Sequence, residues 1–135
     1  MPPELAELRR WLEKADHDLR TAEAALALPK PVTDTAAFHC QQAVEKLLKA
    51  FLCWTEREFE KIHDLRALAL ECATVDDEFQ SWVDRVAPLT TYAVRFRYPG
   101  PHDPTLHEVR SALAMAQAAR GFVLGRLPPE AGEGL

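Results

Sequence analysis

The sequence predicts an all-α protein, an up-and-down antiparallel bundle of four main helices plus one short helix. Apolar residues recur at steps of three and four over long segments, which is the period of an amphipathic helix. No stretch alternates apolar and polar residues with the period of two that a half-buried strand requires. Only a few residues connect the helical segments, and such short connections favour antiparallel neighbours.

The first helix is expected from about Pro3 to Leu28. Pro2 and Pro3 suit its start, because proline has no amide hydrogen to leave unpaired in the first turn. Pro29 and Pro31 end it. Its apolar stripe comprises Leu5, Leu8, Leu12, Ala15, Leu19, Ala22 and Leu26.

A second helix is expected to begin near Thr33 or Asp34, both good N-cap residues, and to continue to about Glu58. Its length and regular pattern place it among the main helices. The residues expected on its buried face are Cys40, Ala43, Val44, Leu47, Phe51 and Trp54.

A short third helix should begin around His63 or Asp64, and a fourth near Asp76. Pro88 falls inside the fourth helix and should kink it, since proline removes one backbone donor and clashes with the preceding turn. The expected inward residues are Leu65, Leu68, Ala69 and Cys72 in the third helix, and Phe79, Trp82, Val83, Val86, Leu89, Ala93 and Phe96 in the fourth.

Residues 98–101, Tyr-Pro-Gly-Pro, end the fourth helix. The fifth should open at Asp103 as N-cap with Pro104 at the first helical position. Residues 1–127 are therefore expected to form one helical domain. Residues 128–135 are polar and without period, and we expect them to be a disordered tail. The expected stripe of the fifth helix is Leu106, Val109, Leu113, Ala116 and Val123.

The composition limits the classes of protein. The 135 residues suit one domain, and no apolar run approaches the roughly 18 residues that span a bilayer. We expect no signal peptide, a cytoplasmic location, and reduced, mostly buried thiols at the three cysteines, which lack metal-site spacing. We expect no metal and no cofactor. The net charge of −5 argues against a broad electrostatic surface for nucleic acid.

A polar stripe runs along the second helix beside its apolar face. His39, Gln42, Lys46 and Lys49 advance by three, four and three residues, so they share one narrow strip. Its imidazole, amide and ammonium groups all carry donors and could hold a phosphate or a nucleotide. The alternative is a solvated helix edge on which Glu45 pairs with Lys49 across one turn.

Two further polar features lie between helices. His63 or Asp64 could cap the third helix or belong to a site. Arg95 and Arg97 stand at the end of the fourth helix and face His102 across a tight turn. An arginine can clamp a phosphate and a histidine can transfer a proton, which are the groups that metal-independent RNA cleavage needs. The alternative is that the arginines stabilise the carboxyl end of their helix.

Residues 38–50, FHCQQAVEKLLKA, resemble the signature of HEPN domains. His63-Asp64-Leu65 and Arg97-Tyr98-Pro99 follow in the order that the family shows, and the resemblance covers about residues 5–127. It implies a four-helix bundle with an extra short helix, usually a homodimer, and a link to nucleotides or RNA. Many small members are encoded beside a minimal nucleotidyltransferase, and some of these pairs are toxin and antitoxin.

The leading hypothesis from the resemblance is a nucleotide- or RNA-associated binding module that acts as a homodimer with a minimal nucleotidyltransferase as partner. Lys46 and Arg97 would hold phosphate, Tyr98 would stack or form a hydrogen bond, and the histidines would orient the ligand. The residues assigned to nucleotide binding are His39, Gln42, Lys46, Lys49, His63, Arg95 and Tyr98.

One alternative is a metal-independent endoribonuclease toxin of a toxin-antitoxin pair, with Arg97 and His102 as catalytic residues. Four residues separate the two, which fits the spacing of active members. In those members, however, a small polar residue tends to follow the arginine, and here Tyr98 follows it. A second alternative is a non-catalytic helical adaptor.

The aromatic content bears on assembly. Trp11, Tyr92, Phe96 and Phe122 exceed what one bundle of this length needs for its core. We therefore expect a dimer face near the fourth helix.

Overall fold

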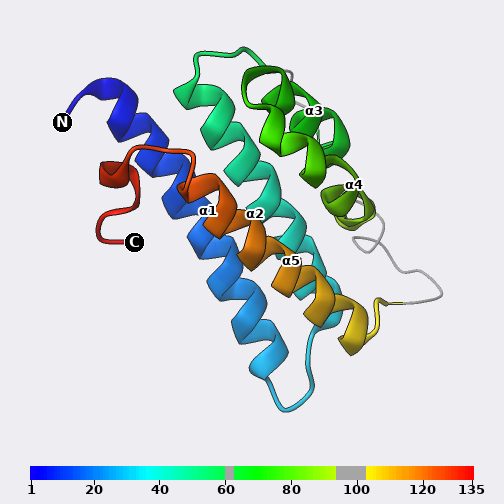
Figure 1. Cartoon of the computed structure of the whole chain (residues 1–135). Coiled ribbons are helices and arrows are strands. Elements are labelled where there is room, and N and C mark those ends of the chain that lie inside the picture. Colours follow the sequence, from blue (N-terminus) through cyan, green and yellow to red (C-terminus); the bar gives the residue numbers. More distant parts are fainter. Residues whose placement is uncertain (60–62, 94–102) are drawn as a thin grey trace.

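The structure is a computed structural model that describes residues 1–59, 63–93 and 103–135. It confirms the all-α class, because this part of the chain contains helices and no strand (Figure 1). The long helices are α1 (Pro3–Ala27), α2 (Thr33–Trp54) and α5 (Leu106–Leu124), and α3 (Leu65–Val75) is shorter.

Helix α2 is the centre of the bundle. It forms an antiparallel pair with α1 and also packs against α5, α3 and the 3-10 helix η2 (Ala87–Ala93) (Figure 1). Because neighbours cover most of its circumference, every residue from Leu47 to Leu52 is buried, Lys49 included. A polar residue on this helix therefore lies close to the core even when it is outside the apolar stripe.

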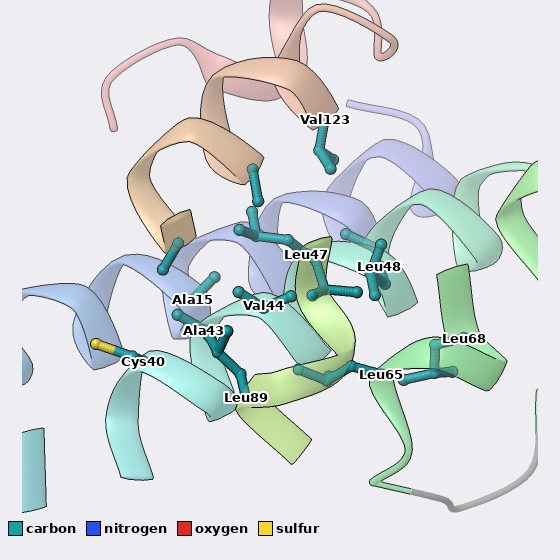
Figure 2. Packing of buried hydrophobic residues seen from close by; sticks show 14 of the residues in the cluster. Ala15, Cys40, Ala43, Val44, Leu47, Leu48, Leu65, Leu68, Leu89 and Val123 are labelled. Atoms are coloured by element: carbon teal, nitrogen blue, oxygen red, sulfur yellow. The ribbon is translucent and has the colours of Figure 1, made fainter. Parts of the chain in front are cut away.

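The apolar periodicity identified most of the core, although the predicted Trp54 and Leu113 are only partly buried. Figure 2 shows Val44, Leu47 and Leu48 of α2 among side chains from other elements, such as Leu65 of α3 and Val123 of α5. All the predicted inward residues of the fourth segment that the structure describes are buried. They are Phe79, Trp82, Val83, Val86, Leu89 and Ala93.

The fourth segment is not the single kinked α-helix that we expected. It consists of the 3-10 helix η1 (Asp77–Trp82), one α-helical turn α4 (Val83–Val86) and η2. Pro88 is the second residue of η2. It has no amide hydrogen, so it cannot donate the backbone hydrogen bond that an α-helix would need there. The tighter 3-10 winding keeps the same side chains facing the core.

Helix α2 ends four residues before the predicted Glu58. Glu56 adopts the left-handed conformation, with φ of 57°. The amide of Glu56 donates to the Cys53 carbonyl, and the amide of Arg57 donates to the Leu52 carbonyl at 2.8 Å. This pair of bonds is a Schellman motif, which normally uses glycine and is therefore hard to recognise from a glutamate.

The helix starts differ from their predicted positions by up to three residues. Helix α2 begins at Thr33 itself, with the apolar Val32 in the cap position. Asp64, one of the two predicted cap residues, is the N-cap of α3. Its side chain accepts hydrogen bonds from the backbone amides of Arg66 and Ala67. Helix α5 begins at Leu106 and not beside Asp103, because Thr105 and Glu108 form a capping box.

Residues 128–135, which we expected to be disordered, have a defined structure. They include the short 3-10 helix η3 (Pro129–Gly132), whose Ala131 is fully buried. The Arg9 guanidinium of α1 donates to the carbonyls of Glu130 and Glu133, each at 2.6 Å. The segment therefore lies against the first half of α1 (Figure 1). No helix in the described residues is long and apolar enough to cross a membrane.

Candidate functional site

The buried carboxylate of Asp18 on α1 joins two of the predicted site residues on α2. Lys46 Nζ donates to one carboxylate oxygen at 2.5 Å, and His39 Nδ1 bonds the other at 2.7 Å. Asp18 is buried, whereas the side chains of Lys46 and His39 keep 23% and 26% of their surface exposed. Part of each of these two side chains is therefore in contact with solvent where α1 and α2 meet. We call these three residues the Asp18 cluster.

The chemistry of the Asp18 cluster follows from its partners. An ionised carboxylate only accepts hydrogen bonds, so Nδ1 of His39 carries the hydrogen and Nε2 is the basic nitrogen. Lys46 uses one of its three donors on Asp18. With a neutral imidazole, the charges of Lys46 and Asp18 cancel. The cluster therefore presents one donor group, the Lys46 ammonium, and one acceptor, Nε2 of His39, with little net charge.

A second buried carboxylate, that of Glu45, is the centre of another hydrogen-bond network. His63 Nδ1 bonds Glu45 at 2.7 Å, and Lys49 Nζ donates to it at 3.2 Å. The fully buried Gln41 donates to Glu45 and to the His63 carbonyl. Gln42 extends this network by donating to Gln41 at 2.7 Å. We call these five residues the Glu45 network.

The exposure of these side chains separates their roles. Lys49 is only 7% exposed, and its ammonium lies 5.7 Å from the Phe59 ring. The local Glu45–Lys49 pair that was the alternative interpretation therefore exists, and Lys49 faces inward. The side chain of His63 is 62% exposed, so its ring reaches solvent while Glu45 holds it. Of the Glu45 network, His63 and Gln42 are the groups that a ligand can reach.

The remaining predicted site residues fall in a part of the chain that the structure does not describe. Arg95, Arg97, Tyr98 and His102 lie outside the described residues, as does Phe96 of the predicted dimer face. The structure brings together His39 with Lys46, and Gln42 with Lys49 and His63, in two carboxylate-centred groups.

Sequence reasoning missed Asp18 and Gln41, and it assigned Glu45 only a local pair. A signal for each was present. Asp18 lies between Ala15 and Ala22 on the apolar stripe of α1, where a charge needs a buried partner. Gln41, Glu45 and Lys49 follow one another at intervals of one turn, but periodicity alone does not show that neighbouring elements cover that face.

The three cysteines are free thiols. Burial, with the nearby carboxylates of Asp18 and Glu23, raises the pKa of Cys40 to about 12. Burial also raises the pKa of Cys72 well above its usual range, and Cys53 is half-buried. In the described residues, no three side chains among His, Cys, Asp and Glu gather in a way that would hold a metal ion.

The aromatic residues on which the dimer face was predicted are partly used within the chain. The Phe122 ring packs against Phe79 and Trp82, with ring centroids 4.9 and 5.3 Å apart. Trp11 meets Phe59 edge to face. Tyr92 is half-buried beside the core.

The fold and the site define a class of protein, an all-α bundle whose central helix carries buried carboxylates that hold histidine and lysine side chains near the surface. The model of the HEPN domain matches residues 8–126, nearly the whole chain. The chain therefore belongs to the HEPN family.

A solved structure supports the same assignment. The crystal structure of TT1696 from Thermus thermophilus is similar to this chain with a TM-score of 0.78 and 31% sequence identity. The match covers 89% of this chain and 98% of that chain. No curated protein is significantly similar to the chain.

Proposed function

We propose that this protein binds the phosphate of a nucleotide or of RNA at the Asp18 cluster and acts as a homodimer with a minimal nucleotidyltransferase as its partner. The observation that carries the proposal is that Lys46 and His39, two turns apart on α2, converge on one carboxylate and remain partly exposed. Lys46 keeps two N–H donors for a phosphate oxygen, and Nε2 of His39 can accept a hydrogen bond from a hydroxyl of the same ligand.

The electrostatics set the expected strength of binding. Asp18 offsets the charge of Lys46, so the anion gains less than it would from an unpaired lysine. We expect dissociation constants of about a millimolar to tens of micromolar, which correspond to a binding free energy of roughly 4–6 kcal/mol in favour of the complex. His63 and Gln42, which the Glu45 network holds near the surface, would contact the sugar or base.

A thermal-shift titration with millimolar nucleotide, and a parallel one with a short single-stranded RNA, test this function. Binding to the folded state should raise the unfolding temperature. Lys46→Ala should abolish the shift. Lys30→Ala makes the same charge change in the exposed connection between α1 and α2 and should retain it. The RNA arm separates a polymer ligand from a free nucleotide.

The absence of a shift with either ligand would contradict the proposal and favour the helical adaptor. An equal loss in Lys46→Ala and Lys30→Ala would indicate nonspecific charge attraction. Light scattering tests the homodimer, which a monomer at micromolar concentration would contradict. Co-purification with a nucleotidyltransferase from the neighbouring gene tests the partner, and separate elution of the two proteins would argue against it.

A further inference from the structure

The two buried carboxylates hold the same kinds of partner. One oxygen of Asp18 bonds Nδ1 of His39, and the other accepts from Lys46. Glu45 repeats this arrangement with Nδ1 of His63 and a second lysine. In each group the carboxylate keeps the imidazole hydrogen on Nδ1, so the free lone pair is on Nε2. Both imidazoles are therefore oriented with Nε2 as the nucleophilic atom.

The lysines distinguish the two histidines. Lys49, the lysine of the Glu45 network, is buried, and its ammonium is turned away from solvent. Lys46 is partly exposed beside His39, and two of its three N–H donors remain for another group. At His39, therefore, an accessible ammonium accompanies the oriented imidazole.

The surroundings of His39 also differ from those of the exposed histidines. Of the histidines that the structure describes, His17 and His107 are exposed and form no ion pair with a carboxylate. Nothing then fixes which ring nitrogen carries the hydrogen. The Phe38 ring, by contrast, meets the imidazole of His39 edge to face, with ring centroids 5.3 Å apart. Phe38 and Asp18 together fix the position of this imidazole.

An oriented imidazole beside an ammonium suits the acceptance of a phosphoryl group. Nε2 can attack the phosphorus atom, and Lys46 can donate to the oxygens of the group that arrives. The ring becomes positively charged because Nδ1 keeps its hydrogen, and the Asp18 carboxylate neutralises that charge. Asp18 also repels the phosphoryl group, but it bonds the other ring nitrogen, away from the new bond.

The proton inventory of the Asp18 cluster selects the class of donor. The hydrogen on Nδ1 of His39 is bonded to Asp18, and Lys46 must stay protonated to hold the phosphoryl oxygens. A phosphate monoester would need a proton for its leaving alkoxide. An acyl phosphate releases a carboxylate, which leaves without a proton. The partial exposure of His39 and Lys46 admits a small donor of this class.

We propose that His39 is a phosphorylation site, at which Nε2 accepts the phosphoryl group of a small acyl phosphate. The Nε2 lone pair forms the N–P bond, the P–O bond to the acyl group breaks, and its electron pair leaves with the carboxylate. The phosphoryl group then lies at Lys46, where the proposed function places the nucleotide phosphate. The inference rests on that function only in this last respect, and it adds a form of regulation: phosphorylation of His39 excludes the nucleotide.

Incubation of the full chain with acetyl phosphate at neutral pH tests the assignment. Mass spectrometry without acid, followed by peptide mapping, should find one phosphoryl group, on His39. Phosphorus NMR should show a phosphoramidate at Nε2 that is labile in acid and stable in alkali. Lys46→Met keeps the aliphatic stem but removes the cation, so the reaction should be about tenfold slower. Lys30→Met makes the same charge change at an exposed residue and should leave the rate unchanged.

His39→Asn removes the nucleophile and should abolish the labelling. His63→Asn is the matched control and should keep it, because the lysine beside this second carboxylate-bonded imidazole is buried. Labelling that persists in His39→Asn, or that spreads equally over His63, His17 and His107, would overturn the inference. If His39→Asn does not fold, peptide mapping of the wild type decides the same question.

Thermal shifts with nucleotide separate this inference from the proposed function. If nucleotide stabilises the untreated protein but acetyl phosphate leaves His39 unmodified, the phosphorylation site is wrong and the proposed function stands. If His39 is phosphorylated but neither nucleotide nor RNA raises the unfolding temperature, the site stands and the proposed function is wrong. Phosphorylated protein should lose the nucleotide shift, and an unchanged shift would overturn the regulation.

Discussion

At the scale of a single residue, Asp18 sets the net charge of the candidate phosphate site. Its carboxylate holds Lys46 and His39 in place, yet it opposes the anion that these groups would bind. A site built in this way favours defined geometry over affinity. The same residue can therefore be tested for both effects.

Asp18→Asn should bind nucleotide phosphate more tightly and fold less stably. The amide keeps the shape but removes the charge that offsets Lys46, and we expect affinity to rise about tenfold, or about 1.4 kcal/mol. The free energy of unfolding should fall by about 2 kcal/mol, because two charge-assisted bonds weaken. Calorimetric titration and urea unfolding measure the two quantities.

Glu23→Gln is the matched control for Asp18→Asn. It makes the same charge change on α1 at an exposed residue whose partner is the neutral Gln117. It should change neither affinity nor stability appreciably. Equal nucleotide affinity in Asp18→Asn and the wild type would show that the anion does not bind beside Asp18.

Cys40 gives a pH-dependent prediction. Its pKa is raised from 9.0 to about 12, so the folded protein keeps the thiol protonated while the unfolded chain loses the proton above pH 9. The protonated thiol therefore contributes fully to the free energy of unfolding below about pH 9, and this contribution is lost as the pH rises toward 12. Between these pH values the free energy of unfolding should decrease less steeply in Cys40→Ala than in the wild type, by about 1.4 kcal/mol per pH unit.

Urea unfolding at several alkaline pH values measures the effect of Cys40→Ala. Cys53→Ala is the comparison, since that thiol is more exposed and should alter the slope less. Parallel slopes for the wild type and Cys40→Ala would refute the assignment of the buried thiol.

At the scale of an element, α2 carries ionised side chains although other helices surround it. Glu45→Leu should cost about 3 kcal/mol, because it leaves the buried Lys49 ammonium without its carboxylate. The double variant Glu45→Leu with Lys49→Met should recover the part of that loss that comes from Lys49, while the lost bonds of Gln41 and His63 to Glu45 still cost stability. Denaturant unfolding of both variants and of Lys49→Met alone gives the coupling. Simply additive losses would mean that the two residues do not act as a pair.

The end of α2 provides a second test at this scale. Glu56 occupies a left-handed position that costs a residue with a β-carbon about 1 kcal/mol. Glu56→Gly should therefore raise the unfolding free energy by about that amount. Glu58→Gly, in the same connection but without positive φ, should not stabilise the protein. A lower melting temperature for Glu56→Gly would contradict the Schellman geometry.

At the scale of the whole molecule, Arg9 joins the first helix to the last residues of the chain. Arg9→Met keeps the aliphatic stem but removes the donors, so amide hydrogens in residues 129–135 should exchange about tenfold faster. Exchange in α1 should stay slow. Arg10→Met, at the exposed neighbouring position, is the control. Unchanged exchange in Arg9→Met would mean that the burial of Ala131 alone holds the segment.

The sequence by itself determined the helices, their order and most of the core, because hydrophobic periodicity is a local property of the chain. For the fourth segment the sequence predicted a helix kinked at Pro88 and not the 3-10 winding, but the six described inward residues of that segment are all buried. The motif in residues 38–50 led to the HEPN family, which the match over residues 8–126 confirmed.

Only the tertiary structure decided what the polar stripe of α2 does. Asp18 reaches His39 and Lys46 from more than twenty residues away, and the neighbours of α2 turn Lys49 from a surface lysine into a buried one. The order of residues 128–135 also depends on contacts between distant segments. Periodicity shows which face of a helix is apolar, but only packing shows how much of the polar face is covered.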